Sequence, residues 1–107
     1  MLVSGKIKKE EMVSPFIKIA VDVETGKVAY GGELHVDCAE ELIVNGSLPK
    51  NVWGANIYPD GKIDYVSLIN IRPLDKNLTM GIGDAEVRGK IAGIMKEMCE
   101  ADIAENN

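Results

Sequence analysis

Four side chains with acid–base or metal-binding chemistry lie close together in the first third of the chain: Glu33, His35, Asp37 and Cys38. In an extended segment, Glu33, His35 and Asp37 would share one face. Imidazole, carboxylate and thiolate are all ligands that zinc accepts. However, Asp37 with Glu40 three residues later also fits the start of a helix, and His35 is the only histidine. We therefore predict no metal ligand and no cofactor.

A second polar group contains two asparagines and an arginine, Asn56, Asn70 and Arg72, with Asp64 nearby on the same predicted face. Asparagine is unfavourable inside a strand, so two of them on one face require a reason. Two amides beside a guanidinium can hold a carboxylate or a phosphate. Alternatively, the asparagines satisfy backbone groups of loops and Arg72 pairs with a nearby acid.

The two polar groups form one candidate site if the segment ending at Val36 lies beside Asn56. A neutral histidine there could act as a base, and the arginine could stabilise a developing negative charge. No nucleophile with its own partner base is evident, so catalytic residues stay unassigned and enzyme activity stays an open alternative. The candidate residues for binding a small anion or a metal are Glu33, His35, Asn56, Asn70 and Arg72.

The element that must position much of this site is a β-hairpin predicted over residues 52–73. Pro59-Asp60-Gly61 suits a three-residue hairpin loop. The odd-numbered positions then make an apolar wall that includes Ile69 and Ile71, while the even positions mix polar and apolar groups. The predicted cross-strand pairs are Ile57 with Ile63, Asn56 with Asp64, and Trp53 with Ser67.

The rest of the chain supplies another hairpin and two helices. A hairpin is predicted over residues 16–32, with Ile19–Val21 in a central strand. Residues 1–15 could form a weak strand near 2–8 or a short helix over 8–13. Residues 33–36 read as a last piece of strand, followed by a short helix over 38–45 with Asp37 as its N-cap. A longer helix starts at Asp84, with an apolar stripe comprising Val87, Ile91, Ile94, Met95, Met98 and Ile103.

These elements predict an α+β fold in a single domain, residues 1–107. We expect an antiparallel sheet of four or five strands, with the C-terminal helix on the odd face of the 52–73 hairpin and the short helix at an edge. One helix cannot cover two faces, so the even face would expose Val52, Val66 and Leu68. Unless the N-terminal segment packs there, a second copy of the chain is the expected cover, which makes a homo-oligomer the expected partner state.

Composition excludes several classes of protein. The 107 residues carry a net charge of −5, which argues against nucleic-acid binding because phosphate contact requires a basic face. No apolar run approaches the ~20 residues of a membrane span, and no secretory signal is evident. Two cysteines, Cys38 and Cys99, are too few for a secreted disulfide framework and are expected to be buried free thiols. We therefore expect a cytoplasmic protein.

Three separated strings resemble a small family of uncharacterised bacterial and archaeal proteins, known only as a domain of unknown function. They are Gly31-Gly32-Glu33-Leu34-His35, Val52 to Pro59 (VWGANIYP) and Leu68 to Pro73 (LINIRP). The resemblance covers about residues 16–98. The family often has an acidic residue where this chain has Val66, and a longer N-terminal helix. The resemblance implies no catalytic role for any residue.

These observations favour a small cytoplasmic, non-enzymatic binding or interaction domain that forms homo-oligomers. The alternative is an enzyme or ligand-binding protein that uses the His35 and Glu33 side chains with the asparagines and Arg72 to bind a small anion or a metal.

Overall fold

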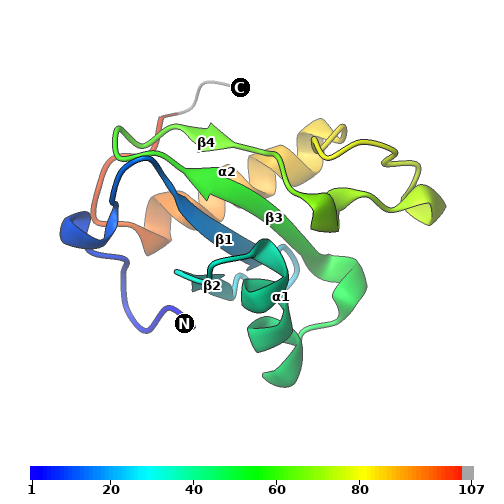
Figure 1. Ribbon diagram of the computed structural model, residues 1–107, viewed down its shortest axis with the longest axis horizontal. Helices are drawn as coiled ribbons and strands as arrows, with labels where there is room; N and C mark the ends of the chain where they lie inside the picture. Colours follow the sequence, from blue (N-terminus) through cyan, green and yellow to red (C-terminus); the bar gives the residue numbers. More distant parts are fainter. Residues whose placement is uncertain (105–107) are drawn as a thin grey trace.

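The structure, a computed structural model that describes residues 1–104, has an α+β fold, as predicted. Its antiparallel sheet has the strand order β2-β1-β3-β4, and a helix lies on each side of it (Figure 1). The strands are β1 (Ile17–Asp22), β2 (Val28–Tyr30), β3 (Val52–Ile57) and β4 (Ile63–Asp64). The helices are α1 (His35–Val44) and α2 (Ala85–Met98).

Strand β1 is central, as its apolar run predicted. It pairs with β2 on one side and with β3 along its whole length on the other, from Ile17 opposite Ile57 to Asp22 opposite Val52. The β1–β2 turn is held by Asp22, whose carboxylate accepts hydrogen bonds from the backbone N–H groups of Glu24 and Thr25. Burial alone would raise the pKa of Asp22, but the nearby Ser47 side chain and the hydrogen bonds of this turn outweigh it and lower the pKa.

The predicted loop between β3 and β4 is confirmed, because Ile57 pairs with Ile63 and Asn56 with Asp64. The predicted continuation of the second strand to Pro73 is wrong. β4 ends at Asp64, after which Val66 bridges Gly81 and Ser67 N–H donates to Met80 O. Two 3-10 turns follow, Leu68–Asn70 and Pro73–Asp75.

The absence of a side chain at Gly54 explains the path of the chain after β4. A Cβ atom at Gly54 would lie 2.7 Å from Cβ and Oγ of Ser67, so the missing side chain lets the chain cross closely over β3. Ser67 therefore does not pair with Trp53. The expectation that Ile69 and Ile71 continue the odd apolar wall is also wrong: Ile69 packs into the cluster on the opposite face, and Ile71 is exposed.

Helix α1 begins at His35, earlier than predicted, so the predicted strand over residues 33–36 is wrong. Asp37 is not the N-cap but lies within the first turn, where its carboxylate accepts a hydrogen bond from Leu34 N–H at 3.1 Å. Gly31 has a φ of +82°, which suits the turn that follows β2. Gly32 leaves room for the helix, because a Cβ atom there would lie 3.1 Å from Asp37 Cβ and 3.2 Å from Cys38 Sγ.

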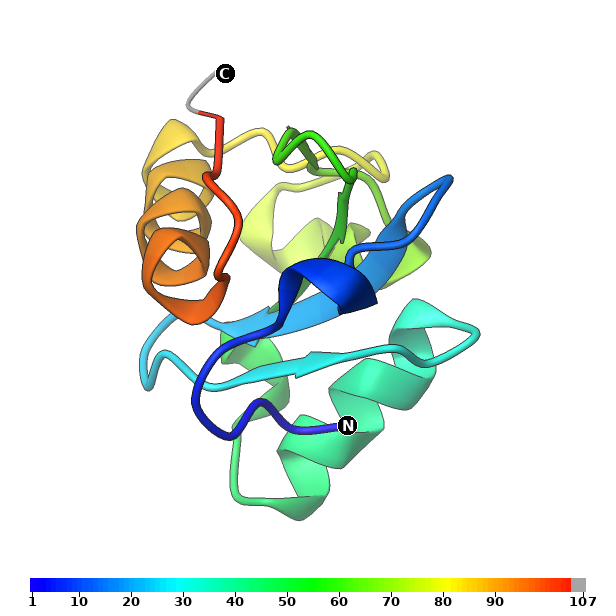
Figure 2. The same ribbon diagram turned by 90° about the vertical axis from the view of Figure 1, so that its left-hand side faces the viewer.

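The two helices cover opposite faces of the sheet (Figure 2). Helix α2, capped by Asp84 as predicted, buries Ile91 and Met95 on the odd face of β3, against a cluster that includes Trp53 and Ile57. The short helix, expected near an edge, packs across the other face over β1 and its neighbours. There Cys38, Ala39 and Leu42 contact Ala20, Ala29 and Val52.

This arrangement corrects the expectation of an open even face, since Val52 is buried although Leu68 remains exposed. It also separates the two buried thiols: Cys38 belongs to the cluster under α1 and Cys99 to the cluster under α2.

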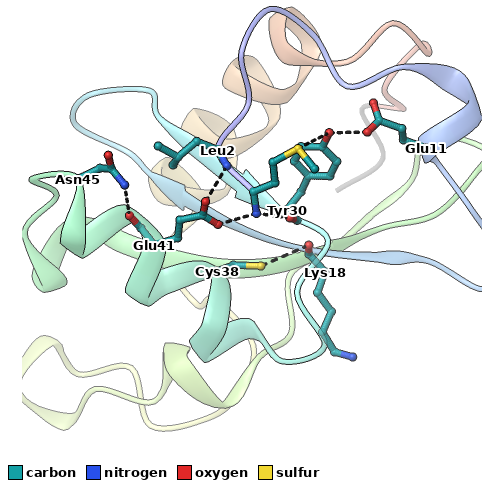
Figure 3. Close-up of polar contacts among 8 residues, drawn as sticks. Leu2, Glu11, Lys18, Tyr30, Cys38, Glu41 and Asn45 are labelled. Atoms are coloured by element: carbon teal, nitrogen blue, oxygen red, sulfur yellow. Dashed lines mark hydrogen bonds and ion pairs between the residues drawn. The ribbon is translucent and has the colours of Figure 1, made fainter.

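The N-terminal segment is neither the full strand nor the helix considered from the sequence. Leu2 bridges Ala29 at the outer edge of β2, Ile7 bridges Cys99, and residues Lys9–Glu11 form one 3-10 turn. Figure 3 shows the polar contacts that hold this segment: the N-terminal amine lies 2.5 Å from a carboxylate oxygen of Glu41, and Tyr30 O–H donates to Glu11. Within residues 1–104, no helix has the length and apolar character needed to cross a membrane.

Candidate functional site

His35, the first residue of α1, lies against β3. Its Nε2 atom is 2.9 Å from Asn56 Oδ1 and 3.0 Å from Ala55 O. The Asn56 amide is oriented by its own donors, because Nδ2 donates to Asp64 Oδ2 and to Val66 O. Both oxygens facing His35 Nε2 are therefore acceptors, so Nε2 carries the proton and, in the neutral ring, Nδ1 keeps a lone pair.

The same surroundings set the charge of the ring. Burial lowers the pKa of His35, and hydrogen bonds from the ring to Ala55 and Asn56 only partly oppose that effect. Lys18 lowers the pKa further and Asp64 raises it. The imidazole is therefore neutral near pH 7, as the sequence-based hypothesis of a neutral histidine beside Asn56 required.

A cavity of about 260 Å³ opens beside His35, between the start of α1 and the turn Leu68–Asn70. Its lining contains one cation, Lys18, two side chains that can form hydrogen bonds, His35 and Ser67, and no carboxylate. The full lining is Lys18, Leu34, His35, Val36, Ser67, Leu68 and Ile69. Lys18 was not singled out from the sequence, because it stands in no recognisable motif, and Ser67 was considered only as a nucleophile that lacks an evident partner base.

Asn70 is fully buried and is bonded to the backbone of β3 rather than facing this cavity. Its Oδ1 accepts from Gly54 N–H at 2.8 Å, and its Nδ2 donates to Gly54 O at 2.9 Å and to Met80 O at 3.1 Å. Two residues that pair in an antiparallel ladder exchange the same two hydrogen bonds. The Asn70 amide thus replaces the strand that β4 no longer provides.

Arg72 also bonds to backbone groups, nearer the start of β3. Its guanidinium donates to Lys50 O at 3.0 Å, to Val52 O and to Ile69 O at 3.2 Å, and it stacks 3.8 Å from the centre of the Trp53 ring. Burial lowers the pKa of Arg72, and the negative charge of Asp75 partly opposes this lowering. The guanidinium is bonded to carbonyl groups, and within residues 1–104 it forms no ion pair, so the expected pairing of Arg72 with a nearby acid is not found. Of the asparagines, Asn70 satisfies backbone groups, whereas Asn56 also contacts the side chains of His35 and Asp64.

The five candidate residues are therefore only partly brought together. His35 and Asn56 are in contact, whereas Asn70 and Arg72 bond to positions further along β3, and Glu33 is exposed. Within residues 1–104 no three side chains of histidine, cysteine, aspartate or glutamate gather as a metal site would require.

Asn77 is a buried polar residue that the sequence did not single out for a site. Its Nδ2 lies within 2.8 to 3.1 Å of Asn70 O, Thr79 O and Gly81 O, and its Oδ1 accepts from Gly83 N–H at 2.9 Å. One side chain thus joins backbone groups of residues 70, 79, 81 and 83.

Residues 67–80, here called the 67–80 loop, have inverted polarity. Their buried side chains are polar: Ser67, Asn70 and Asn77. Their exposed side chains include five large apolar ones, with exposed fractions of 72% for Leu68, 43% for Ile71, 99% for Leu74, 71% for Leu78 and 42% for Met80. The only hint of this in the sequence is that asparagines are interleaved with leucines, which fits no helical or strand period.

A larger cleft of about 470 Å³ lies at the start of α2, but its lining balances three lysines against three carboxylates. The lysines are Lys50, Lys76 and Lys90, and the acids are Glu24, Asp75 and Asp84. Such a lining selects neither an anion nor a cation.

Comparison with known proteins identifies one family. A family model described as "Protein of unknown function (DUF5674)" matches residues 4–98, which is most of the chain. No curated protein and no solved structure gives a significant match.

Proposed function

The chain belongs to the DUF5674 family of proteins of unknown function, and from its geometry we propose that it is a non-catalytic interaction module that self-associates through the 67–80 loop. The observation that carries this proposal is the inverted polarity of that loop. Large exposed apolar groups gathered in one segment mark an interaction surface more often than chance exposure does.

The loop is held in place by its own polar side chains. Asn70, Arg72 and Asn77 make ten hydrogen bonds with backbone groups, three each to Asn70 and Arg72 and four to Asn77. A surface ordered in advance loses little conformational entropy on association. Full burial of a leucine, isoleucine or methionine side chain is worth about 1.5 to 3 kcal/mol, so the three leucines with Ile71 and Met80 supply on the order of 10 kcal/mol, comparable with the ~4 to 15 kcal/mol cost of association.

The charges at the tip of the loop favour a second copy of this chain as the partner. Leu74 is followed by Asp75 and Lys76, both exposed and of opposite sign. Among residues 1–104, neither side chain forms an ion pair within the chain. A two-fold axis beside Leu74 would bring Asp75 of one copy to Lys76 of the other, and the reverse pair would form by symmetry.

Sedimentation velocity over about 1 µM to 1 mM protein tests the proposal, a range that brackets weak and moderate dimers. We expect wild-type dimers, and monomers for Leu74→Asp, because an aspartate at the centre of the contact would be desolvated without a partner. Val13→Asp is the matched control, since Val13 is 53% exposed but lies outside the loop.

A charge exchange tests the partner's identity. Asp75→Lys alone should weaken the dimer because it creates like charges across the axis, and adding Lys76→Asp should restore it. A wild-type monomer at high micromolar concentration, or a double variant no better than Asp75→Lys, would contradict self-association. A stable monomer that binds a different protein would contradict self-association and leave only the proposal that the 67–80 loop is an interaction surface.

We also propose a cytoplasmic location, which is supported by the two free thiols buried in separate clusters. Fractionation of cells that express the full-length protein tests this, and recovery outside the cytoplasm would contradict it.

A further inference from the structure

The cavity beside His35 differs from the larger cleft at the start of α2 in the kind of ligand that its lining selects. Its walls are apolar, supplied by Leu34, Val36, Leu68 and Ile69. It has one charged lining residue, Lys18, and that charge is positive. Small-molecule sites are typically apolar concavities with a few placed polar groups, and this lining has that composition.

We propose that this cavity binds a small monocarboxylate with an aliphatic or aromatic body, its carboxylate against Lys18 and Ser67 and its body against Leu34, Val36 and Leu68. This inference goes beyond self-association, because every group it uses belongs to one copy of the chain.

The Lys18 ammonium is available for such a ligand. Lys18 pairs with Asn56 across β1 and β3, which places its side chain on the same face as His35. Its Nζ atom lies 5.7 Å from the centre of the Phe16 ring, and among residues 1–104 it has no carboxylate partner. A cation beside apolar walls attracts an anionic head group more strongly than it would in open solvent.

Ser67 supplies a hydrogen-bond donor. Its Oγ accepts from Ile69 N–H at 3.3 Å, which leaves the hydroxyl proton free to donate. The residue is buried, and Gly54 packs directly against it. A carboxylate oxygen can accept this proton while its charge interacts with Lys18.

His35 reports on an occupied cavity. A carboxylate in the cavity favours the protonated imidazole, so ligand binding should raise the pKa of His35 towards its ordinary value. The charged groups that act on the ring in the absence of ligand are Lys18, which lowers the pKa, and Asp64, which raises it.

The experiment is an NMR titration of ¹⁵N-labelled full-length protein with benzoate, isobutyrate, acetate and the uncharged isobutyramide. We expect shifts at the His35 ring and at the amides of residues 34–36 and 67–69. The Kd for benzoate should be about 1 mM or tighter, as for a well-placed fragment, and isobutyramide should bind at least about tenfold more weakly than isobutyrate. Isobutyramide binding as well as isobutyrate, or no shift with any compound, would overturn the proposal.

Variants test the role of the cation. Lys18→Met keeps the aliphatic stem and removes the charge, so affinity for benzoate should fall at least tenfold, whereas Lys62→Met, on the exposed hairpin loop, should leave it unchanged. Equal affinity of Lys18→Met and wild type would overturn the assignment. The amide comparison needs no variant and decides the question even if Lys18→Met fails to fold.

Self-association and carboxylate binding can be contradicted independently of each other. Leu74→Asp should abolish dimers but still bind benzoate, and Lys18→Met should still form dimers. Loss of benzoate binding in a correctly folded Leu74→Asp monomer would show that the cavity requires the second copy and would overturn the present inference.

Discussion

Asn70 illustrates how a single side chain can act as an element of a sheet. Its amide exchanges two hydrogen bonds with Gly54, where a neighbouring strand would normally pair. Arg72 satisfies the carbonyl of Val52 two residues away, on the same edge of β3. The edge left unpaired by the short β4 is thereby closed by side chains, which also removes a site for edge-to-edge aggregation.

The Asn70→Ala substitution should destabilise the fold by about 2 kcal/mol or more, because the buried N–H and C=O groups of Gly54 both lose their partner and each costs about 1 to 3 kcal/mol, whereas Met80 O keeps the hydrogen bond from Ser67 N–H. Asn70→Asp should be similarly harmful at neutral pH, since a carboxylate would face the carbonyl groups of Gly54 and Met80. Part of the loss in Asn70→Asp should be recovered as the pH falls and the acid gains a proton.

Urea denaturation at pH 7 and pH 4 measures both effects. The control is Asn45→Ala, which removes one exposed hydrogen bond to Glu41 O and should cost less than about 1 kcal/mol. Equal midpoints for Asn70→Ala and Asn45→Ala would contradict the strand-like role of Asn70.

Sequence reasoning succeeded for residues whose role depends on near neighbours in the chain. Asp84 caps α2, and Gly26 takes the positive φ expected in its turn. Proximity of His35 to Asn56 was considered as a condition for a joint site; the two side chains do meet, but His35 starts a helix and does not lie in a strand ending at Val36. Asn77 was missed, because its four partners are backbone groups whose positions no side-chain pattern records.

At the scale of elements, both hairpin loops were predictable from turn chemistry, but the length of β4 was not. Alternation of apolar residues predicts a strand, yet it cannot reveal that residues 65–67 pair with residues 80–82 instead of β3. The decisive feature is the missing side chain of Gly54, whose consequence appears only when Ser67 is packed against it. Tertiary packing overrode a local pattern here.

Two glycine substitutions should have opposite effects on stability. Gly54→Ala should cost about 1 to 3 kcal/mol, because a Cβ atom would lie 2.7 Å from Ser67 atoms and force the crossing chain away. Gly93→Ala, on the exposed side of α2 with nothing within 4 Å, should stabilise the protein by about 0.5 to 1 kcal/mol. Thermal denaturation of both variants beside wild type checks the signs, and a neutral Gly54→Ala would refute the close crossing.

The hydrogen bond between Tyr30 and Glu11, which holds the N-terminal segment, can be tested by tyrosine absorbance. Tyr30 O–H donates to Glu11 Oε2 at 2.5 Å, and this bond with burial raises the pKa of Tyr30 to about 12. The same bond is the main reason that the pKa of Glu11 is lowered. Glu11→Gln should therefore move the Tyr30 pKa back towards about 10, its value in an unfolded chain.

The direction of the Tyr30 pKa shift decides at which pH this hydrogen bond stabilises the fold. The pKa of Tyr30 is higher in the folded protein, so the stability that it contributes is fully present below about pH 10 and disappears as the pH rises through about 12. Tyrosinate absorbance during alkaline titration measures the change, with Glu10→Gln as the neighbouring control. An unchanged titration of Glu11→Gln would mean that Tyr30 and Glu11 do not interact in solution.

At the scale of the whole molecule, the sheet has a helix on each face, so the reason first given for self-association, an open even face, does not hold. Five of the large exposed apolar side chains lie instead on the 67–80 loop, and others lie on and around α1, among them Leu34, Val44 and Leu48. Figure 1 shows the backbone of residues 67–80 running beyond the sheet. The fold class was predictable because periodicity distinguishes strands from helices. The sequence did not predict which apolar side chains stay exposed, because that depends on how the buried asparagines hold the 67–80 loop.

Self-association should also appear as a dependence of thermal stability on concentration. A partner that binds only the folded chain raises stability by mass action, so a hundredfold increase in wild-type concentration above the dimer Kd should raise Tm by about 5 °C for a chain of this size. Leu74→Asp should melt at one temperature throughout that range, and Val13→Asp should behave as wild type. Differential scanning calorimetry at two concentrations measures this without any assumption about shape. A wild-type Tm independent of concentration would contradict self-association, because dimerisation and folding are necessarily linked.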